Sequence, residues 1–258
     1  MNKTLPPFSM RPNWLRIIGA HEVMAFSTMT VILTFVVALL PLPPLAAPML
    51  VVIIPSLVAC GLINLTEGKG QVRAQLFRAD HWRMPFKWLL ITLGLGLVGR
   101  LLAWGLALVL NIPAQITPPS PLLVAVIVFA AGEEIGWRGY VLPRLLRSHS
   151  ALAASLLLAI PWAVLHYALM LPGGMLAGTP PLGHSLFIFS TSVLLAWTYL
   201  RSRRSLLAAT LLHGWINTPG LITFPGSASA IWILAAAQAV LAIVVVLANR
   251  KEFGEIHT

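Results

Sequence analysis

Residues 230–248 read AIWILAAAQAVLAIVVVLA, a run with no charged side chain. A helix of about 20 apolar residues crosses the roughly 30 Å hydrocarbon core of a bilayer. The whole chain of 258 residues has this character, because 58% of its residues are apolar, 9% are charged and the mean hydropathy is +0.88. Soluble domains carry about 25% charged residues. The sequence therefore predicts an all-α integral membrane protein in which residues 1–258 form a single membrane domain.

Apolar runs of this kind recur along the chain and predict eight membrane-spanning helices. They lie at Glu22–Leu40, Ala46–Leu65, Trp88–Leu110, Pro121–Leu142, Ala151–Leu171, His184–Leu200, Ser205–Leu221 and Ala230–Ala248. The seventh run is interrupted by Pro219 and Gly220, so its end is the least defined by pattern.

The distribution of basic residues predicts the orientation of these spans. The connections 41–48, 111–120, 172–183 and 218–229 contain no Lys or Arg, whereas the alternate connections and both chain ends are basic. Basic segments stay in the cytoplasm. We therefore expect an even number of spans with both termini cytoplasmic.

The net charge of +10 has the same origin. Of the 17 Lys and Arg residues, all but Arg100 and Arg138 lie in segments predicted to be cytoplasmic, where they face anionic lipid headgroups. No basic block with interleaved aromatic residues occurs on a soluble domain, which argues against nucleic-acid binding. The expected partner is the lipid bilayer.

Ionisable side chains inside a bilayer are costly and therefore mark candidate functional sites. The candidates are Arg100, Glu133, Glu134, His166 and His213, with Arg138 just beyond and Asn217 as a polar neighbour. At 1.5 Å per residue, positions from four different spans fall near the middle of the bilayer. The pattern predicts one polar site, with its core at about residues 121–221.

Helical spacing indicates which of these side chains can act together. Three pairs are four residues apart and share a helix face: Glu134 with Arg138, Trp162 with His166, and His213 with Asn217. Glu133 points about 100° away from Glu134. Arg138 can thus neutralise one carboxylate while its neighbour faces a different environment.

Each residue taken singly also has a structural explanation. A lone intramembrane His or Asn often hydrogen-bonds between helices, and the Glu134–Arg138 pair alone is typical of a structural ion pair. Arg100 could pair with a carboxylate or extend to the membrane surface. His184 lies at an external boundary and is interpreted as incidental. The combination of Glu133 with the other polar candidates is less easily explained in this way.

Together these residue types favour hydrolysis. A Glu can act as general base on water with help from a His, and a second His with an Asn can donate hydrogen bonds to an oxyanion. The set Glu133, His166 and His213 could instead hold a catalytic zinc with an open water position. The zinc-protease pattern HExxH and the serine-hydrolase elbow GxSxG are both absent from the sequence. We favour the metal-free interpretation, with no cofactor.

The residues also carry a resemblance to a known family. The stretch GEEIGWRGYVLPRL (Gly132–Leu145) resembles the first motif, EExxxR, of the CPBP family, the CaaX-protease and bacteriocin-processing (Abi) membrane proteins. The second motif of that family, FxxxH, is met as WxxxH by Trp162 and His166, and the third, HxxxN, by His213 and Asn217. The three motifs occur in the expected order over Leu122–Asn217.

The resemblance implies an eight-helix intramembrane glutamic peptidase that hydrolyses membrane-associated proteins or peptides, in the cytoplasmic membrane of a prokaryote. By this resemblance, Glu133 and His166 would activate water, and His213 and Asn217 would form the oxyanion hole. Glu134 and Arg138 would order the site, and the larger ring of Trp162 would narrow the pocket.

Two other classes of protein use a similar polar core. The first is a non-catalytic membrane scaffold or a bacteriocin-immunity-type protein. The second is a transporter, in which polar residues at the midplane bind ions. The complete motif set favours the peptidase, although the motifs do not specify its substrate or predict processing of prenylated proteins.

Overall fold

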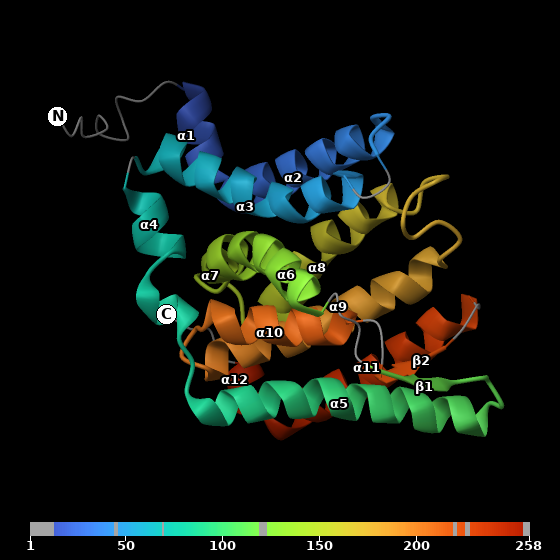
Figure 1. Cartoon of the computed structure of the whole chain (residues 1–258). Coiled ribbons are helices and arrows are strands. Elements are labelled where there is room, and N and C mark those ends of the chain that lie inside the picture. Colours follow the sequence, from blue (N-terminus) through green and yellow to red (C-terminus); the bar gives the residue numbers. More distant parts are fainter. Residues whose placement is uncertain are drawn as a thin grey trace.

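The computed structural model describes residues 13–43, 46–68, 70–118, 123–218, 221–224 and 228–254. The predicted basic positions Lys3, Arg11 and Lys69, and the first residues of the fourth expected span, lie outside these ranges. In the described part the chain is almost wholly helical (Figure 1). This confirms the predicted all-α class.

Six helices in the described ranges are long and apolar enough to cross a membrane, and they coincide with six of the expected spans. They are α2 (Glu22–Leu39), α3 (Ala46–Thr66), α5 (Phe86–Val109), α8 (Ala151–Ala168), α9 (Pro181–Arg201) and α11 (Ala228–Ala248). The protein is therefore an integral membrane protein. The cytoplasmic placement of both termini stays a prediction.

The fourth and seventh expected spans differ from simple spanning helices. The fourth is α6 (Leu123–Gly136), which continues through a π-helical turn (Trp137–Val141) into α7 (Leu142–Leu145). The seventh ends as α10 (Leu206–Asn217), about 18 Å long, because Thr218 precedes a proline and takes an extended conformation. The prediction that this helix continues to Leu221 was wrong.

Several short elements were not predicted. The helices are α1 (Asn13–Ala20), α4 (Gln71–Leu76) and α12 (Arg250–Gly254), with a 3₁₀ turn at Ala79–Trp82. Strands β1 (Gln115–Thr117) and β2 (Leu221–Thr223) pair antiparallel, with Ile116 opposite Ile222. They join the α5–α6 connection to the segment that follows α10.

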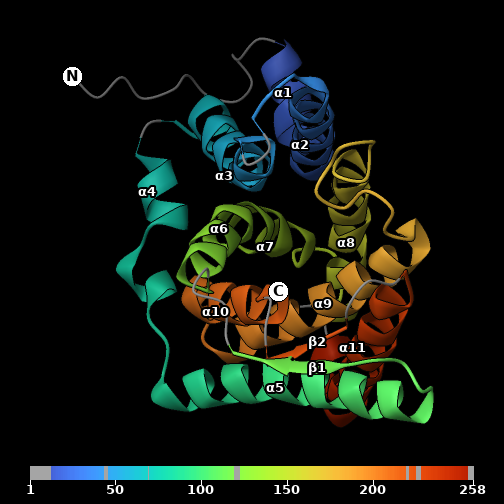
Figure 2. The same ribbon diagram turned by 45° about the vertical axis from the view of Figure 1, so that its right-hand side comes forward.

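The segment α6–α7 lies at the centre of the bundle. Figure 2 shows it enclosed by α2 and α3 on one side, α8 on another, and α9 and α10 below. Contacts agree with this view, since α6 packs against α3 and α10, α8 against α2 and α9, and α11 against α5 and α9. The end of α6 that bears the first motif is thus buried, whereas Val124 and Val128 in its first half are exposed.

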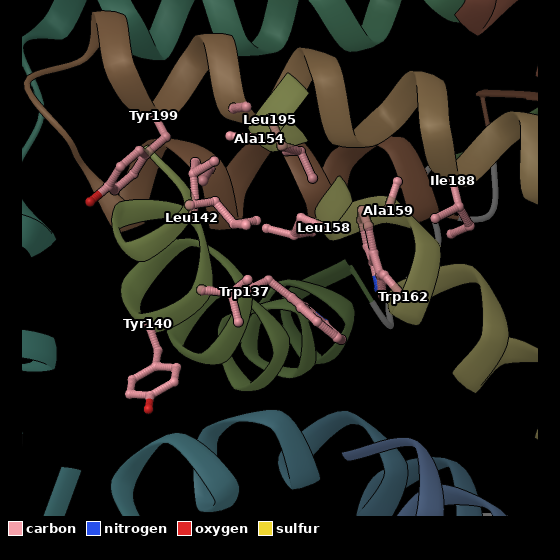
Figure 3. Close-up of a cluster of buried hydrophobic side chains, with 14 of the residues drawn as sticks. Trp137, Tyr140, Leu142, Ala154, Leu158, Ala159, Trp162, Ile188, Leu195 and Tyr199 are labelled. Carbon is pink, nitrogen blue, oxygen red and sulfur yellow. The ribbon is translucent and has the colours of Figure 1, made fainter. Parts of the chain in front are cut away.

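The core around α7 and α8 is formed by interlocking large and small side chains. The ring centres of Trp137 and Trp162 of α8 are 6.4 Å apart, whereas Tyr140 points to the opposite side (Figure 3) and its ring stacks on Phe26 of α2 at 5.4 Å. The side chains of Trp137, Tyr140, Leu142 and Trp162 are fully buried. Leu90, Leu97 and Leu101 of α5 are instead exposed. The outward apolar face of α5 is suited to lipid contact.

A buried guanidinium joins the helix ends on the side predicted to be cytoplasmic. Arg144 forms ion pairs with Glu22 of α2 and with Glu67, whose Oε1 lies 2.6 Å from Arg144 Nη2. Its Nη1 donates to the carbonyl of Tyr140 at 3.1 Å, and its charged group lies 3.6 Å from the centre of the Tyr140 ring. These contacts hold α2, α3 and α7 together.

Candidate active site

Two glycines let α6 lie directly against α3. A Cβ atom at Gly132 would lie 2.8 Å from the carbonyl oxygen of Val52, and one at Gly136 would lie 2.6 Å from Pro55. The hydroxyl of Ser56 donates to the carbonyl of Gly132. Close backbone approach through small residues is a common way to pack helices in membranes. It fixes the position of the two glutamates that lie between these glycines.

A third glycine brings α10 against another side of α6. A Cβ atom at Gly214 would lie 2.7 Å from Cγ1 and 2.8 Å from Cα of Ile127. Because His213 precedes this glycine, the close crossing carries its imidazole to the carboxylates of α6. Two motifs separated by about 80 residues in the sequence thus meet in one site.

Glu134 is the centre of a buried polar network. Its Oε1 accepts hydrogen bonds from Arg138 Nη1 at 2.9 Å and from His213 Nδ1 at 2.8 Å. The side chains of Glu134 and Arg138 are fully buried. Arg138 also donates to Ser192 Oγ at 3.4 Å and lies 4.5 Å from the centre of the Trp162 ring. The predicted pairing across one helical turn is confirmed.

Glu133 has different partners from its neighbour. Its Oε2 accepts a hydrogen bond from Trp162 Nε1 at 2.7 Å, and among the described residues no group donates to its Oε1. The residue is 7% exposed, while Glu134 is fully buried. The two adjacent carboxylates therefore have distinct environments, as the helical spacing predicts.

His166 is fixed by its own helix. Its Nδ1 lies 2.7 Å from the carbonyl oxygen of Trp162, and because a carbonyl only accepts, Nδ1 carries the proton. The lone pair of the neutral ring is then on Nε2. The Trp162 ring contacts two imidazoles, with its centre 6.1 Å from that of His166 and 5.3 Å from that of His213.

The end of α10 is held by Arg100. Its Nη2 donates to the carbonyls of Ile216 at 2.8 Å and Thr218 at 2.9 Å, and its Nη1 donates to Ile222 at 3.4 Å. A cation at a helix C-terminus satisfies free carbonyls and the helix dipole. Arg100 therefore supports α10 through its carbonyls. Asn217, the last residue of this helix, has an exposed side chain.

Sequence reasoning missed His184 as a neighbour of the site. It lies in the first turn of α9, is 7% exposed, and its ring centre is 5.0 Å from that of His166. The two residues belong to different helices, so helical spacing gave no signal that they meet. That His184 lies close to His166 could be found only from the packing of α8 against α9.

The arrangement supplies the groups for acid–base hydrolysis. Glu133 Oε1 and His166 Nε2 have no hydrogen bonds to other described residues, so they can engage a water. In the described ranges, no three His, Cys, Asp or Glu side chains are grouped closely enough to hold a metal ion. The zinc alternative of Glu133, His166 and His213 therefore has no assembled ligand set here, and metal-free chemistry stays a prediction.

Comparison with known proteins shows what the motif-bearing segment is similar to. Residues 115–219 match the family described as "Type II CAAX prenyl endopeptidase Rce1-like". The chain is also 29% identical over 104 residues to a Methanococcus maripaludis protein called "CAAX prenyl protease 2", and this match spans 38% of either chain. All three motifs lie inside the matched segment. The motif-bearing segment of this chain is therefore similar to a family of CAAX prenyl endopeptidases.

Proposed function

We propose that the protein is an intramembrane endopeptidase that hydrolyses peptide bonds of membrane-associated proteins or peptides by a water-based, glutamate-dependent mechanism. The observation that carries this proposal is the division between the two adjacent carboxylates. Arg138 and His213 both bond Oε1 of the fully buried Glu134, whereas Glu133 accepts a hydrogen bond only from the Trp162 indole among the described residues and is the less deeply buried carboxylate. The names of the matched family and relative support a peptidase.

Activation of water is assigned to Glu133 and His166. Glu133 takes a proton from a water molecule as the resulting hydroxide attacks the substrate carbonyl. His166, whose Nδ1–H is held by the Trp162 carbonyl, offers Nε2 to the same water. When the C–N bond breaks, the proton held by Glu133 passes to the leaving nitrogen. The products are a carboxylic acid and an amine, so atoms and charge balance.

Stabilisation of the oxyanion is assigned to His213 and Asn217. The Nδ1–H of His213 is donated to Glu134, so donation from Nε2 requires the doubly protonated ring. The Glu134 carboxylate, which also pairs with Arg138, attracts the charge of such a ring. Asn217 lies one turn further along α10, and its amide can donate a second hydrogen bond. Arg100 holds the end of the helix that presents both groups.

The test is cleavage by purified protein in detergent or liposomes. The probe is a fluorescent peptide that ends in a Cys-aliphatic-aliphatic-X sequence with a farnesyl group as its prenyl chain. It is chosen because the names of the matched family and of the relative both contain "CAAX prenyl". The unprenylated peptide is the second arm. We expect cleavage of the prenylated probe by the wild type and none by Glu133→Gln. Glu252→Gln is the matched control, because Glu252 pairs with Arg201 on an exposed surface.

The outcome of this test separates the candidate functions. Cleavage of both peptides would show an endopeptidase without a prenyl requirement. Full activity of Glu133→Gln would exclude the proposed mechanism. A folded protein that binds the probe but cleaves neither peptide would favour the non-catalytic scaffold.

A further inference from the structure

A second buried imidazole lies beside His166. The rings of His184 and His166 are 5.0 Å apart between centres and inclined by 44°. The His184 ring also lies 6.3 Å from that of Phe187. The two histidines come from α8 and α9, which pack against each other along the core shown in Figure 3. His184 is thus enclosed at the edge of the candidate site.

The hydrogen-bonding capacity of this pair is largely unused. Neither Nδ1 nor Nε2 of His184 has a hydrogen-bond partner among the described residues, although both atoms are buried. His166 uses only Nδ1, on the carbonyl of Trp162. A buried polar group without a partner costs free energy, so such groups in native structures need an explanation. Because His166 Nε2 is assigned to the catalytic water, the two nitrogens of His184 remain available for a ligand beside it.

Neighbouring polar side chains satisfy themselves locally, which makes His184 distinct. Ser185, the next residue, donates to the carbonyl of Pro181 at 2.8 Å and contacts Tyr167 Oη at 2.7 Å. Tyr167 itself follows His166 in α8. The helices therefore provide hydrogen bonds to the residues directly after both histidines, while the His184 ring receives none. A ring that served packing alone would be better replaced by an apolar side chain.

A substrate peptide supplies what these nitrogens lack. At membrane depth, backbone N–H and C=O groups have no water to bind, so a substrate that unwinds for cleavage needs partners from the enzyme. An imidazole can donate from one nitrogen and accept at the other. The position beside His166 places this capacity next to the bond to be cleaved.

We propose that His184 is a substrate-binding residue, which hydrogen-bonds the peptide backbone of the substrate beside His166. This inference rests on the proposed peptidase function, because the ligand of His184 is taken to be the extended backbone of a peptide substrate. In this proposal His184 binds the substrate backbone, and Glu133 and His166 carry out the proton transfer.

The test measures binding separately from chemistry. In the Glu133→Gln background, the affinity for the farnesylated fluorescent peptide is compared with and without His184→Leu, which removes both nitrogens at similar volume. Loss of a hydrogen bond that leaves a buried partner unsatisfied predicts a Kd raised roughly 5- to 100-fold. His184→Gln keeps a donor and an acceptor, so it should recover at least half of this loss on a logarithmic scale.

Two controls separate binding from folding. Tyr167→Phe removes the hydroxyl that contacts Ser185, next to both histidines, and should leave the Kd unchanged. In the active protein, His184→Leu should raise KM by the same factor as Kd while kcat changes by less than about threefold. The thermal midpoints of all variants are measured in the same detergent.

Three outcomes would overturn the assignment of His184, and a fourth would separate it from the proposed function. An unchanged Kd in His184→Leu, or a lowered kcat with unchanged KM, overturns the assignment. A Kd that rises equally in His184→Gln and His184→Leu also overturns it, because a lost hydrogen bond would be partly restored by Gln. A wild type that binds the peptide through His184 but never cleaves it contradicts the proposed function while supporting this inference.

Discussion

Removing the charge of Arg138 gives a quantitative test of the buried network. Arg138 and Glu134 are both fully buried and joined by a 2.9 Å ion pair. Arg138→Met keeps much of the side-chain volume but leaves Glu134 as a buried carboxylate whose one remaining hydrogen-bond donor among the described residues is His213. Breaking a buried pair in this way costs about 3–5 kcal/mol, because an uncompensated charge remains.

The variant series isolates the charge from the packing. Adding Glu134→Gln to Arg138→Met removes the unpaired carboxylate, so the double variant should recover most of the lost stability while remaining poorly active. Arg201→Met is the matched control, since Arg201 and Glu252 form an ion pair with half-exposed side chains. A pair exposed in this way contributes about 0–1 kcal/mol.

The assay is equilibrium unfolding in mixed detergent micelles, followed by tryptophan fluorescence, with turnover measured on the same samples. If Arg138→Met lost less than about 1 kcal/mol, close to the Arg201→Met control, the account of Glu134 as a charge balanced by Arg138 would be refuted. A double variant as unstable as the single one would show that packing of the guanidinium, including its contact with the Trp162 ring, dominates.

Three further predictions follow from other contacts. Gly136→Ala places a methyl group 2.6 Å from Pro55 and should destabilise the protein by about 1–3 kcal/mol, whereas Gly105→Ala in α5 meets no atom within 4 Å and should be neutral in the same unfolding assay. Asn217→Ala should lower kcat by about 10²–10³ with an unchanged thermal midpoint, because its side chain is exposed; normal turnover would exclude Asn217 from the oxyanion hole. Activity should survive exhaustive chelation, and loss of activity that added zinc restores would require a metal-dependent mechanism.

The sequence predicted the spans well because hydropathy reports directly on contact with lipid. Helices α2, α3, α5 and α11 begin and end within two residues of their expected limits. The limits of α10 were less predictable. Its early end depends on a proline and on Arg100, which satisfies the carbonyls that a longer helix would have used.

Within the site, contacts along one helix were predictable and contacts between helices were not. The spacing of four residues predicted the Glu134–Arg138 pair and the shared face of Trp162 and His166. Hydropathy says nothing about the rotation or pairing of spans, so the bonds from Trp162 to Glu133 and from His213 to Glu134 appear only in the folded protein.

The departure from Phe to Trp in the second motif illustrates the same limit. From the sequence, a larger ring was expected to narrow the pocket. In the structure, Trp162 is fully buried and its indole N–H binds Glu133, a contact that Phe cannot make. The substitution thus adds a hydrogen bond to the proposed base. That Trp162 bonds to Glu133 could not be inferred from helical spacing, because the two residues lie on different helices.

The most direct test of the account is a comparison of Glu133→Gln with the wild type in binding and turnover of the same farnesylated peptide. The account predicts that this substitution leaves the thermal midpoint and the peptide Kd near wild-type values, while turnover falls by about 10²–10⁴ because the general base is lost. Wild-type turnover in a folded Glu133→Gln protein would contradict the central claim that this carboxylate activates the water.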